Sequence, residues 1–251
     1  MELMLSSPAR VLLLVIGCAV LRSLESVMPL YRLGGHRLRR ALPNIGLSVL
    51  LLLTNLALSF AVAAVAGYAH RVGMRVAGWV GVVIGIAALD FFAYVAHVLL
   101  HKMPVGWRFH RVHHSDEAVD VTTAFRQHPG ETVWRVVWQL PAILLFGLPL
   151  WVVAVYLTIS AANAQLEHAN VRLGERLDRV LRLLFVTPNM HKVHHSCIQR
   201  ETDSNYSNIF SVWDRLFGTY TRRVDFEKLR YGLDAKAEPG LRALLAMPFA
   251  G

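Results

Sequence analysis

SVLLLLTNLALSFAVAAVAGYA, residues 48–69, is an apolar run without a single charged side chain. A helix of about 20 mostly apolar residues is long enough to cross the hydrocarbon core of a bilayer. A second run, residues 77–96, carries only one charged residue, Asp90, and a third, Val11–Leu21, is a shorter candidate span. These runs predict an all-α fold, an integral-membrane helical bundle.

A fourth apolar block, residues 133–160, contains Pro141, Gly147 and Pro149. Proline and glycine interrupt or bend long helices. The block is therefore either a hairpin of two short helices or a single bent span.

The segment between Val11–Leu21 and the run at residues 48–69 sets the expected orientation, because five arginines stand there against one acid, Glu25. The positive-inside rule places such a segment in the cytoplasm. Two crossings later the chain is back on that side, and a hairpin at residues 133–160 keeps it there. We therefore expect a multi-pass protein with a cytoplasmic helical cap, and the arginine-rich composition suggests a bacterial inner membrane.

The formal charge of +9 does not indicate a nucleic-acid partner, because most basic residues flank the apolar runs. Anionic lipid head groups supply the counter-charge there. Four arginines recur at helical spacing in residues 172–184, beside leucine and valine. This segment is either a helix in the membrane surface or an amphipathic helix packed on the cap.

The two cysteines, Cys18 and Cys197, support neither a disulfide framework nor an iron–sulfur cluster.

His-Arg-Val-His-His-Ser at residues 110–115 returns as His-Lys-Val-His-His-Ser at residues 191–196, so two copies hold six of the twelve histidines. On a helix, positions i, i+3 and i+4 share one face, and the three imidazoles converge. Convergent imidazoles are ligands for a transition metal, whereas scattered surface histidines would not repeat the spacing. No flexible linker separates a further domain, and residues 1–251 are expected to form one domain.

His97 and His101 are four residues apart at the end of the second apolar run. Val98 follows His97, so the glutamate of a zinc-protease helix is missing. Asp90 lies seven residues before His97 on the same helical face. It is expected to accept a hydrogen bond that orients a ligand imidazole, or else to be a polar contact between helices.

The two hexapeptides together with His97 and His101 supply eight imidazoles. One tetrahedral metal ion takes four ligands, so two metal ions are expected. His168 is a possible ninth ligand or a structural residue, and His128 is expected to be structural or to orient a ligand. The predicted metal ligands are His97, His101, His110, His113, His114, His168, His191, His194 and His195.

The ordered histidine motifs are followed by Asp203-x-Asn205-Tyr206 and by Trp-Asp-Arg-Leu-Phe-Gly-Thr at residues 213–219. From about Asp90 to Thr219 the chain resembles the fatty acid hydroxylase and sterol desaturase superfamily. The resemblance implies a membrane enzyme that holds two non-haem iron ions on histidines. Such an enzyme uses dioxygen to hydroxylate or desaturate an unactivated C–H bond of a membrane lipid.

By the same resemblance the nine histidines bind iron, with His168 at an isolated site. Asp90, Asp203 and Asn205 would orient ligands or metal-bound water, and so would Glu167. The sequence departs from the family pattern at Ser207, where glycine is common. It also has Ala164 where many fatty acyl hydroxylases carry a further histidine, which disfavours fatty acyl 2-hydroxylation.

An external electron source is implied as well, because no flavin, nicotinamide or iron–sulfur motif accompanies the histidines. A separate ferredoxin-like or cytochrome-type donor with an acidic surface would suit the basic cap, with Arg108 and Arg111 as the expected docking residues.

The alternative functions are a zinc-dependent membrane hydrolase and a membrane protein that transports or binds metal. A transporter would place its polar ligands along the spans, whereas these histidines lie beyond the second apolar run.

Overall fold

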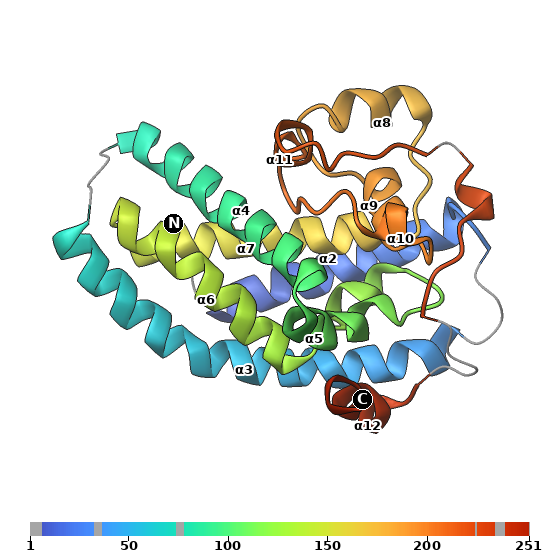
Figure 1. The fold of residues 1–251 in the computed structure, drawn as a ribbon, viewed down its shortest axis with the longest axis horizontal. Helices are drawn as coiled ribbons and strands as arrows, with labels where there is room; N and C mark the ends of the chain where they lie inside the picture. The colour runs from blue at the N-terminus through green and yellow to red at the C-terminus, as the bar shows by residue number, and fades with distance from the viewer. Residues whose placement is uncertain (1–6, 33–36, 74–77, 224, 234–238, 251) are drawn as a thin grey trace.

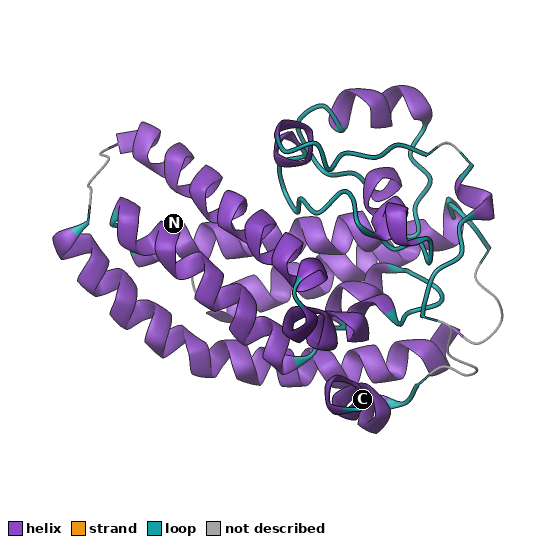
Figure 2. Ribbon diagram, viewed as in Figure 1, coloured by secondary structure: helices purple, strands orange, loops and turns teal. Residues whose placement is uncertain are grey.

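The computed structural model describes residues 7–32, 37–73, 78–223, 225–233 and 239–250. Within these ranges every regular element is a helix, and extended pairing is limited to isolated bridges such as Phe185 with Phe210 (Figure 2). The five long helices are α2 (Ser7–Val27), α3 (Arg37–Val72), α4 (Gly78–Lys102), α6 (Pro129–Phe146) and α7 (Leu150–His168). The shorter elements are α5 (Pro104–His114), η1 (Val121–Phe125), α8 (Glu175–Leu181), α9 (Pro188–His194), α10 (Gln199–Thr202), α11 (Val212–Leu216), η2 (Phe226–Lys228), α12 (Leu241–Ala246) and η3 (Met247–Phe249).

The two longest apolar runs form α3 and α4. Residues 40–72 and 78–102 are long and apolar enough to cross a membrane. Only 6% of the most apolar window of α3 is buried within the protein, and the rest of that window is exposed or only partly buried. Outward apolar side chains are expected where lipid is the solvent, and the two helices are candidate membrane spans.

The punctuated block is a hairpin, the first of the two predicted forms. Helix α6 ends at Gly147, which adopts the left-handed conformation with φ of 56° and donates its N–H to the Ile143 carbonyl. Pro149 then precedes the first turn of α7. Pro141 lies inside α6, so the break comes from the Gly147–Pro149 turn.

The N-terminal run is contained in α2, which lies beside α7. The Gln165 amide donates to the carbonyl oxygen of Leu14 at 3.0 Å. At the other end of α2 the buried Glu25 carboxylate accepts the backbone N–H groups of Val121 and Asn170, at 2.7 and 2.8 Å. These bonds fix α2 to η1 and to the chain that follows α7.

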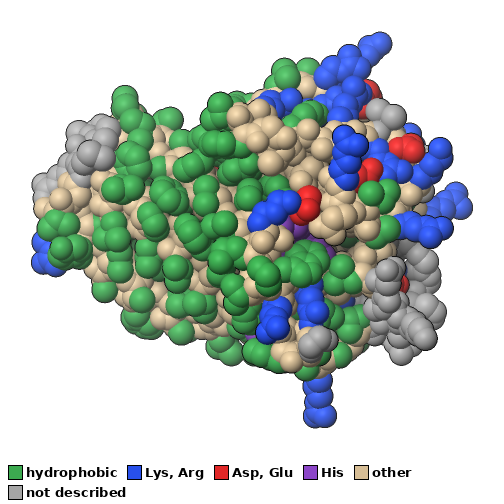
Figure 3. Space-filling view, in the orientation of Figure 1, with side chains coloured by type: hydrophobic (Ala, Val, Ile, Leu, Met, Phe, Trp, Pro, Cys, Tyr) green, Lys and Arg blue, Asp and Glu red, His purple; other side chains and the backbone are tan. Residues whose placement is uncertain are grey.

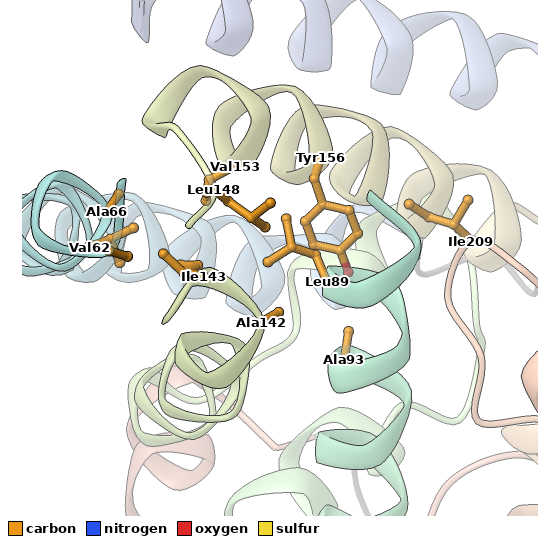
Figure 4. Close-up of a cluster of buried hydrophobic side chains, with 11 residues drawn as sticks. Val62, Ala66, Leu89, Ala93, Ala142, Ile143, Leu148, Val153, Tyr156 and Ile209 are labelled. Carbon is orange, nitrogen blue, oxygen red and sulfur yellow. The ribbon is translucent and has the colours of Figure 1, made fainter. Parts of the chain in front are cut away.

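An apolar core joins α3, α4, α6 and α7 (Figure 4). Leu89 of α4 and Tyr156 of α7 are fully buried there, among small side chains of α3 and α6. Hydrophobic side chains cover the part of the surface around α3, α4 and α6, whereas Lys and Arg gather at the opposite end, around α8 to α10, which we call the cap (Figures 1 and 3). Histidine atoms are visible at the boundary between these two regions (Figure 3).

Candidate metal centre

All nine histidines predicted as ligands fall into two compact groups. Within each group, the nitrogen atoms that could bind a metal lie within 4.8 Å of one another. The first group is His97, His101, His110, His114 and His194. The second group is His113, His168, His191 and His195.

The repeated hexapeptide explains how the two groups form. The first copy is on α5, and its i and i+4 histidines, His110 and His114, belong to the first group. Its i+3 histidine joins the second group. The copy on α9 does the reverse: His191 and His195 enter the second group, and His194 enters the first. Each copy thus contributes to both groups, and neither group is complete without both helices.

The nitrogen distances fit a metal ion in each group. His168 Nε2 lies 3.0 Å from the Nε2 atoms of His113, His191 and His195. In the first group, the Nε2 atoms of His97 and His110 are 3.1 Å apart. Ligands about 2.1 Å from one ion are separated by roughly 3.0–3.4 Å.

Buried nitrogen atoms without a partner support the same conclusion. The Nε2 atoms of His101, His114 and His194 are buried, and each lacks a hydrogen-bond partner among the described residues. Such atoms are costly in a folded protein unless something binds them. A metal ion would bind them.

Backbone carbonyls orient the imidazole rings. Nδ1 of His97 donates to the Tyr206 carbonyl at 2.6 Å, and Nδ1 of His194 donates to the Ser204 carbonyl at 2.8 Å. In the second group, Nδ1 of His168 donates to a carbonyl of its own helix at 2.6 Å. Because a carbonyl can only accept, the proton lies on Nδ1 and the Nε2 lone pair faces the other imidazoles.

Three carboxylates lie close to the imidazoles. Asp203 Oδ1 is 3.7 Å from His101 Nδ1, and Glu167 Oε1 is 3.8 Å from atoms of both His168 and His191. The nearby His101 imidazole, together with Gln199 and Lys102 at 3.0 and 2.9 Å, holds the pKa of Asp203 well below its usual range. The third, Glu131 Oε1, lies 3.0 Å from His110 Nδ1. Glu131 was not among the residues predicted from the sequence, because it lies on α6, outside the histidine motifs.

The contacts of Asp90 correct one prediction. Its buried carboxylate accepts hydrogen bonds from Ile209 N at 3.2 Å, Phe210 N at 3.0 Å and Trp213 Nε1 at 2.9 Å. No imidazole among the described residues donates to it. Asp90 therefore fixes the chain at 209–213 to α4, and the role in orienting a ligand imidazole was wrong.

Asn205 forms hydrogen bonds with backbone groups of two neighbouring segments. It adopts a positive φ of 52°, and its side-chain amide donates to the carbonyls of Met190 and Thr221, at 3.0 and 2.8 Å. Its own oxygen accepts the N–H of Thr221 at 2.9 Å. It thereby holds the 204–207 turn, which carries the carbonyls facing His97 and His194.

Asp214 holds the same turn as well, and it was not among the residues predicted from the sequence. Its fully buried carboxylate accepts Tyr206 N at 2.8 Å and Ser207 N at 3.0 Å. It also accepts the Thr219 hydroxyl at 2.7 Å. Asp214 thus fixes the peptide whose carbonyl accepts the His97 proton.

Lys192 is a further buried charge beside the second group. Its ammonium donates to the carbonyl oxygen of His168, and the side chain has no exposed surface. Burial lowers its pKa to about 7. Lysine occupies the place that Arg111 has in the first copy of the repeat.

His128 lies outside both groups and has a structural role, in agreement with one of the predicted alternatives. Its Nδ1 accepts the Gly130 N–H at 3.0 Å and caps the start of α6. Replacing His128 with alanine should lower the stability of the protein by about 1 kcal/mol, the usual cost of a lost N-cap. Bound metal per chain should stay unchanged. Thermal unfolding and metal analysis of the purified variant test this, and a loss of metal would show that His128 belongs to the centre.

The imidazoles of α5 and the second repeat are neutral at pH 7, because burial lowers the pKa of each one well below its ordinary value. This applies to His110, His113, His114, His191, His194 and His195. Neighbouring imidazoles lower these pKa values further, since charges on several rings would repel. Neutral imidazole is the form that binds a metal ion.

Because these imidazoles stay neutral in the folded state, the stability of the metal-free chain should depend on pH. The unfolded chain protonates its histidines below pH about 6.5, whereas the folded chain keeps them neutral. Stability should therefore be complete above that pH and should fall as the pH drops below it. Below that pH, each such histidine should lower the free energy of unfolding by about 1.4 kcal/mol per pH unit. Unfolding of chelator-treated protein between pH 8 and 5.5 measures this, and a flat or rising profile toward pH 5.5 would contradict the neutral assignment.

Comparison with known proteins agrees with this arrangement. The model of the family described as fatty acid hydroxylase matches residues 82–219, more than half of the chain. The chain therefore belongs to the fatty acid hydroxylase family. No solved structure matches it.

Among curated proteins, ornithine lipid hydroxylase OlsE of Rhizobium tropici is 36% identical over 175 residues, which cover 67% of this chain and 50% of that protein. Human alkylglycerol monooxygenase is 31% identical over 157 residues, which cover 62% of this chain and 33% of that protein. Fatty acid hydroxylase vlmA of a Lecanicillium species is 26% identical, over 59% of this chain and 44% of that protein. The chain thus spans a third to a half of the length of these relatives.

Proposed function

We propose that the protein is a dioxygen-dependent, non-haem di-iron enzyme that hydroxylates a membrane lipid. The observation that carries the proposal is the assembly of nine buried imidazoles into groups of five and four that share both copies of the repeat. Two irons would supply the activation of dioxygen and the oxidation of an unactivated C–H bond. Zinc has no redox chemistry and could not serve in their place.

The residues of the chain have distinct tasks in this proposal. The first group would hold one iron and the second group the other. The carbonyls of Tyr206, Ser204 and Ala164 keep the Nε2 atoms of three ligands turned inward. Asp203, Glu131 and Glu167 provide negative charge or proton acceptors beside the rings, as second partners of metal-binding histidines commonly do.

The location of the two groups argues against metal transport. They lie at one end of α4 and on α5, α7 and α9, whereas a transport path would place polar ligands along the spans. A catalytic zinc site keeps three protein ligands and one open position. Groups of five and four imidazoles exceed that requirement, so a zinc hydrolase is also disfavoured.

The names of the relatives support a proposal for the substrate class and the reaction. Their names describe an ornithine lipid hydroxylase and an alkylglycerol monooxygenase, and both names combine a lipid with a polar group, ornithine or glycerol. We infer that this protein hydroxylates such a polar membrane lipid rather than desaturating it. The histidines at the boundary between apolar surface and charged cap suit a substrate whose chain stays in the bilayer (Figure 3).

Labelled dioxygen tests the reaction. The full chain in lipid nanodiscs, with a chemical reductant and ¹⁸O₂, should add one ¹⁸O atom to an ornithine lipid or an alkylglycerol, detected by mass spectrometry. The His195→Ala variant is the inactive control. Loss of two hydrogens without label would indicate desaturation, and turnover without dioxygen would overturn the proposal.

The proposed setting is a multi-pass protein of a bacterial inner membrane with the centre facing the cytoplasm. Electrons would come from a separate ferredoxin-like or cytochrome-type donor with an acidic surface. Of the expected docking residues, Arg108 is exposed, whereas the Arg111 guanidinium donates to the carbonyls of Met247 and Ala250. Arg108 is therefore the better docking residue of the two.

A further inference from the structure

Helix α8 buries one charged side chain and exposes its apolar ones. Asp178 has no exposed surface and Arg182, just after the helix, is buried as well. On the opposite side Leu177 is 53% exposed and Val180 is 66% exposed. An amphipathic helix packed on a soluble domain buries its apolar face and exposes its charges. The packed-helix alternative for residues 172–184 therefore does not describe α8.

Hydrogen bonds fix α8 in this orientation. The Asp178 carboxylate accepts the Thr187 hydroxyl at 2.6 Å and pairs with the Arg182 guanidinium. The Arg182 carbonyl accepts the Ser211 hydroxyl at 2.8 Å and the Arg215 guanidinium at 2.7 Å. Turning the apolar face inward would break these bonds and leave buried charges unpaired, which is costly.

The exposed apolar face continues to a candidate membrane span. Leu216 of α11 is 67% exposed, and the next residue, Phe217, is about half exposed. The Phe217 ring lies against α4, 5.6 Å from the ring of Tyr94 and 5.8 Å from that of Phe91. We call these side chains, together with those of α8 and its C-terminal turn, the outer apolar patch. Its members are Leu177, Val180, Leu183, Leu184, Phe185, Val212, Leu216 and Phe217.

Positive charge accompanies the patch. Arg172 and Arg176 are exposed on or just before α8, and so is Arg179, although it lies 3.7 Å from the exposed Glu175 of the same helix. Apolar side chains combined with arginine are typical of helices that lie in the membrane interface, where the arginines meet anionic head groups. An area this apolar is also unusual on a surface that faces water.

We propose that the outer apolar patch is inserted into the interface of the same bilayer that α3 and α4 cross. The patch is a second attachment of the cap, beyond the candidate spans. Asp178 bonds to Thr187, whose hydroxyl accepts the Met190 N–H and caps α9, the helix of the second histidine repeat. If the histidines form the proposed catalytic centre, the attachment fixes the height of that centre above the lipid.

Spin labels test the insertion without relying on activity or metal. In the full chain with Cys18→Ser and Cys197→Ser, a nitroxide is attached at Val180→Cys, at Leu216→Cys or at Lys228→Cys. Lys228 is the matched control, because its side chain is 77% exposed in the charged tail. The labelled protein is placed in nanodiscs of phosphatidylglycerol and phosphatidylethanolamine. Power saturation then compares collisions with dioxygen, which concentrates in lipid, and with a water-soluble nickel chelate.

Both patch labels should show a ratio of dioxygen to nickel collisions several-fold higher than the control label. Nickel accessibility equal to that of the Lys228→Cys label would overturn the proposal. Protection from both reagents would also overturn it, because a protein partner or a second copy would then cover the patch. Iron content and lipid turnover are separate measurements, so failure of the proposed hydroxylase function would leave this result intact.

Discussion

Replacing His110 with alanine is expected to abolish lipid turnover and to remove the metal ion of the first group. His110 Nε2 lies 3.1 Å from His97 Nε2, and its Nδ1 faces Glu131 at 3.0 Å. Loss of a residue that only orients a ligand typically costs 10–100-fold in metal affinity or activity. Loss of a ligand itself should therefore cost more than about 100-fold. Metal analysis should find about one ion per chain in place of two.

His70→Ala is the matched control for this variant. His70 is exposed near the end of α3 and belongs to neither group, and its ring lies 3.3 Å from the Gly147 carbonyl. The control should keep both ions and full turnover. A His110→Ala protein that keeps two ions and its activity would exclude His110 as a ligand.

The Asp214→Asn variant should have the second largest effect, although Asp214 contacts no histidine of either group directly. Its carboxylate fixes the Tyr206 and Ser207 amides, and the Tyr206 carbonyl accepts the His97 proton. Asparagine keeps the shape but offers one acceptor oxygen in place of two. The turn should then loosen, and the affinity for metal in the first group should fall about 10–100-fold.

Chelator competition on folded protein measures that affinity, and thermal unfolding measures stability separately. Asp225→Asn is the control, because Asp225 pairs with Arg223 in the tail and is partly exposed. If Asp214→Asn lowers stability but leaves metal affinity unchanged, Asp214 is a structural residue without a positioning role. A fall in affinity in the folded variant identifies it as a positioning residue.

The sequence predicted that the histidines gather better than it predicted how they are arranged. Spacing within each hexapeptide showed that the imidazoles of a copy share one helical face, and all nine predicted histidines do gather. The exchange of His113 and His194 between the groups could not be predicted. It depends on how α5 and α9 face each other in space, and helical spacing describes only one helix at a time.

The same limit explains the error at Asp90. The spacing from Asp90 to His97 shows a shared face on α4, but the donors to Asp90 come from residues 209–213, far along the chain. Glu131 and Asp214 reach the imidazoles or their supporting turn in the same way, through tertiary packing. Long apolar runs are easier to interpret, because their length alone identifies α3 and α4 as candidate spans.

For the hairpin and for the helix at residues 175–181, the sequence narrowed the structure to two alternatives but could not choose between them. The Gly147–Pro149 turn is a local signal, yet it could not exclude a bent span until the packing of α6 and α7 was known. In residues 172–184 the periodicity of leucine and arginine fitted two environments equally. The burial of Asp178 and the exposure of Val180 favour the helix in the membrane surface, and both depend on the tertiary structure.

Metal analysis of protein purified without oxygen and without added metal tests the central claim most directly. Elemental analysis combined with Mössbauer spectroscopy counts the ions and shows whether they are coupled. We expect two irons per chain, in one exchange-coupled pair once the protein is oxidised. A single tightly bound zinc ion, together with lipid turnover that needs no dioxygen, would contradict the assignment of a di-iron hydroxylase.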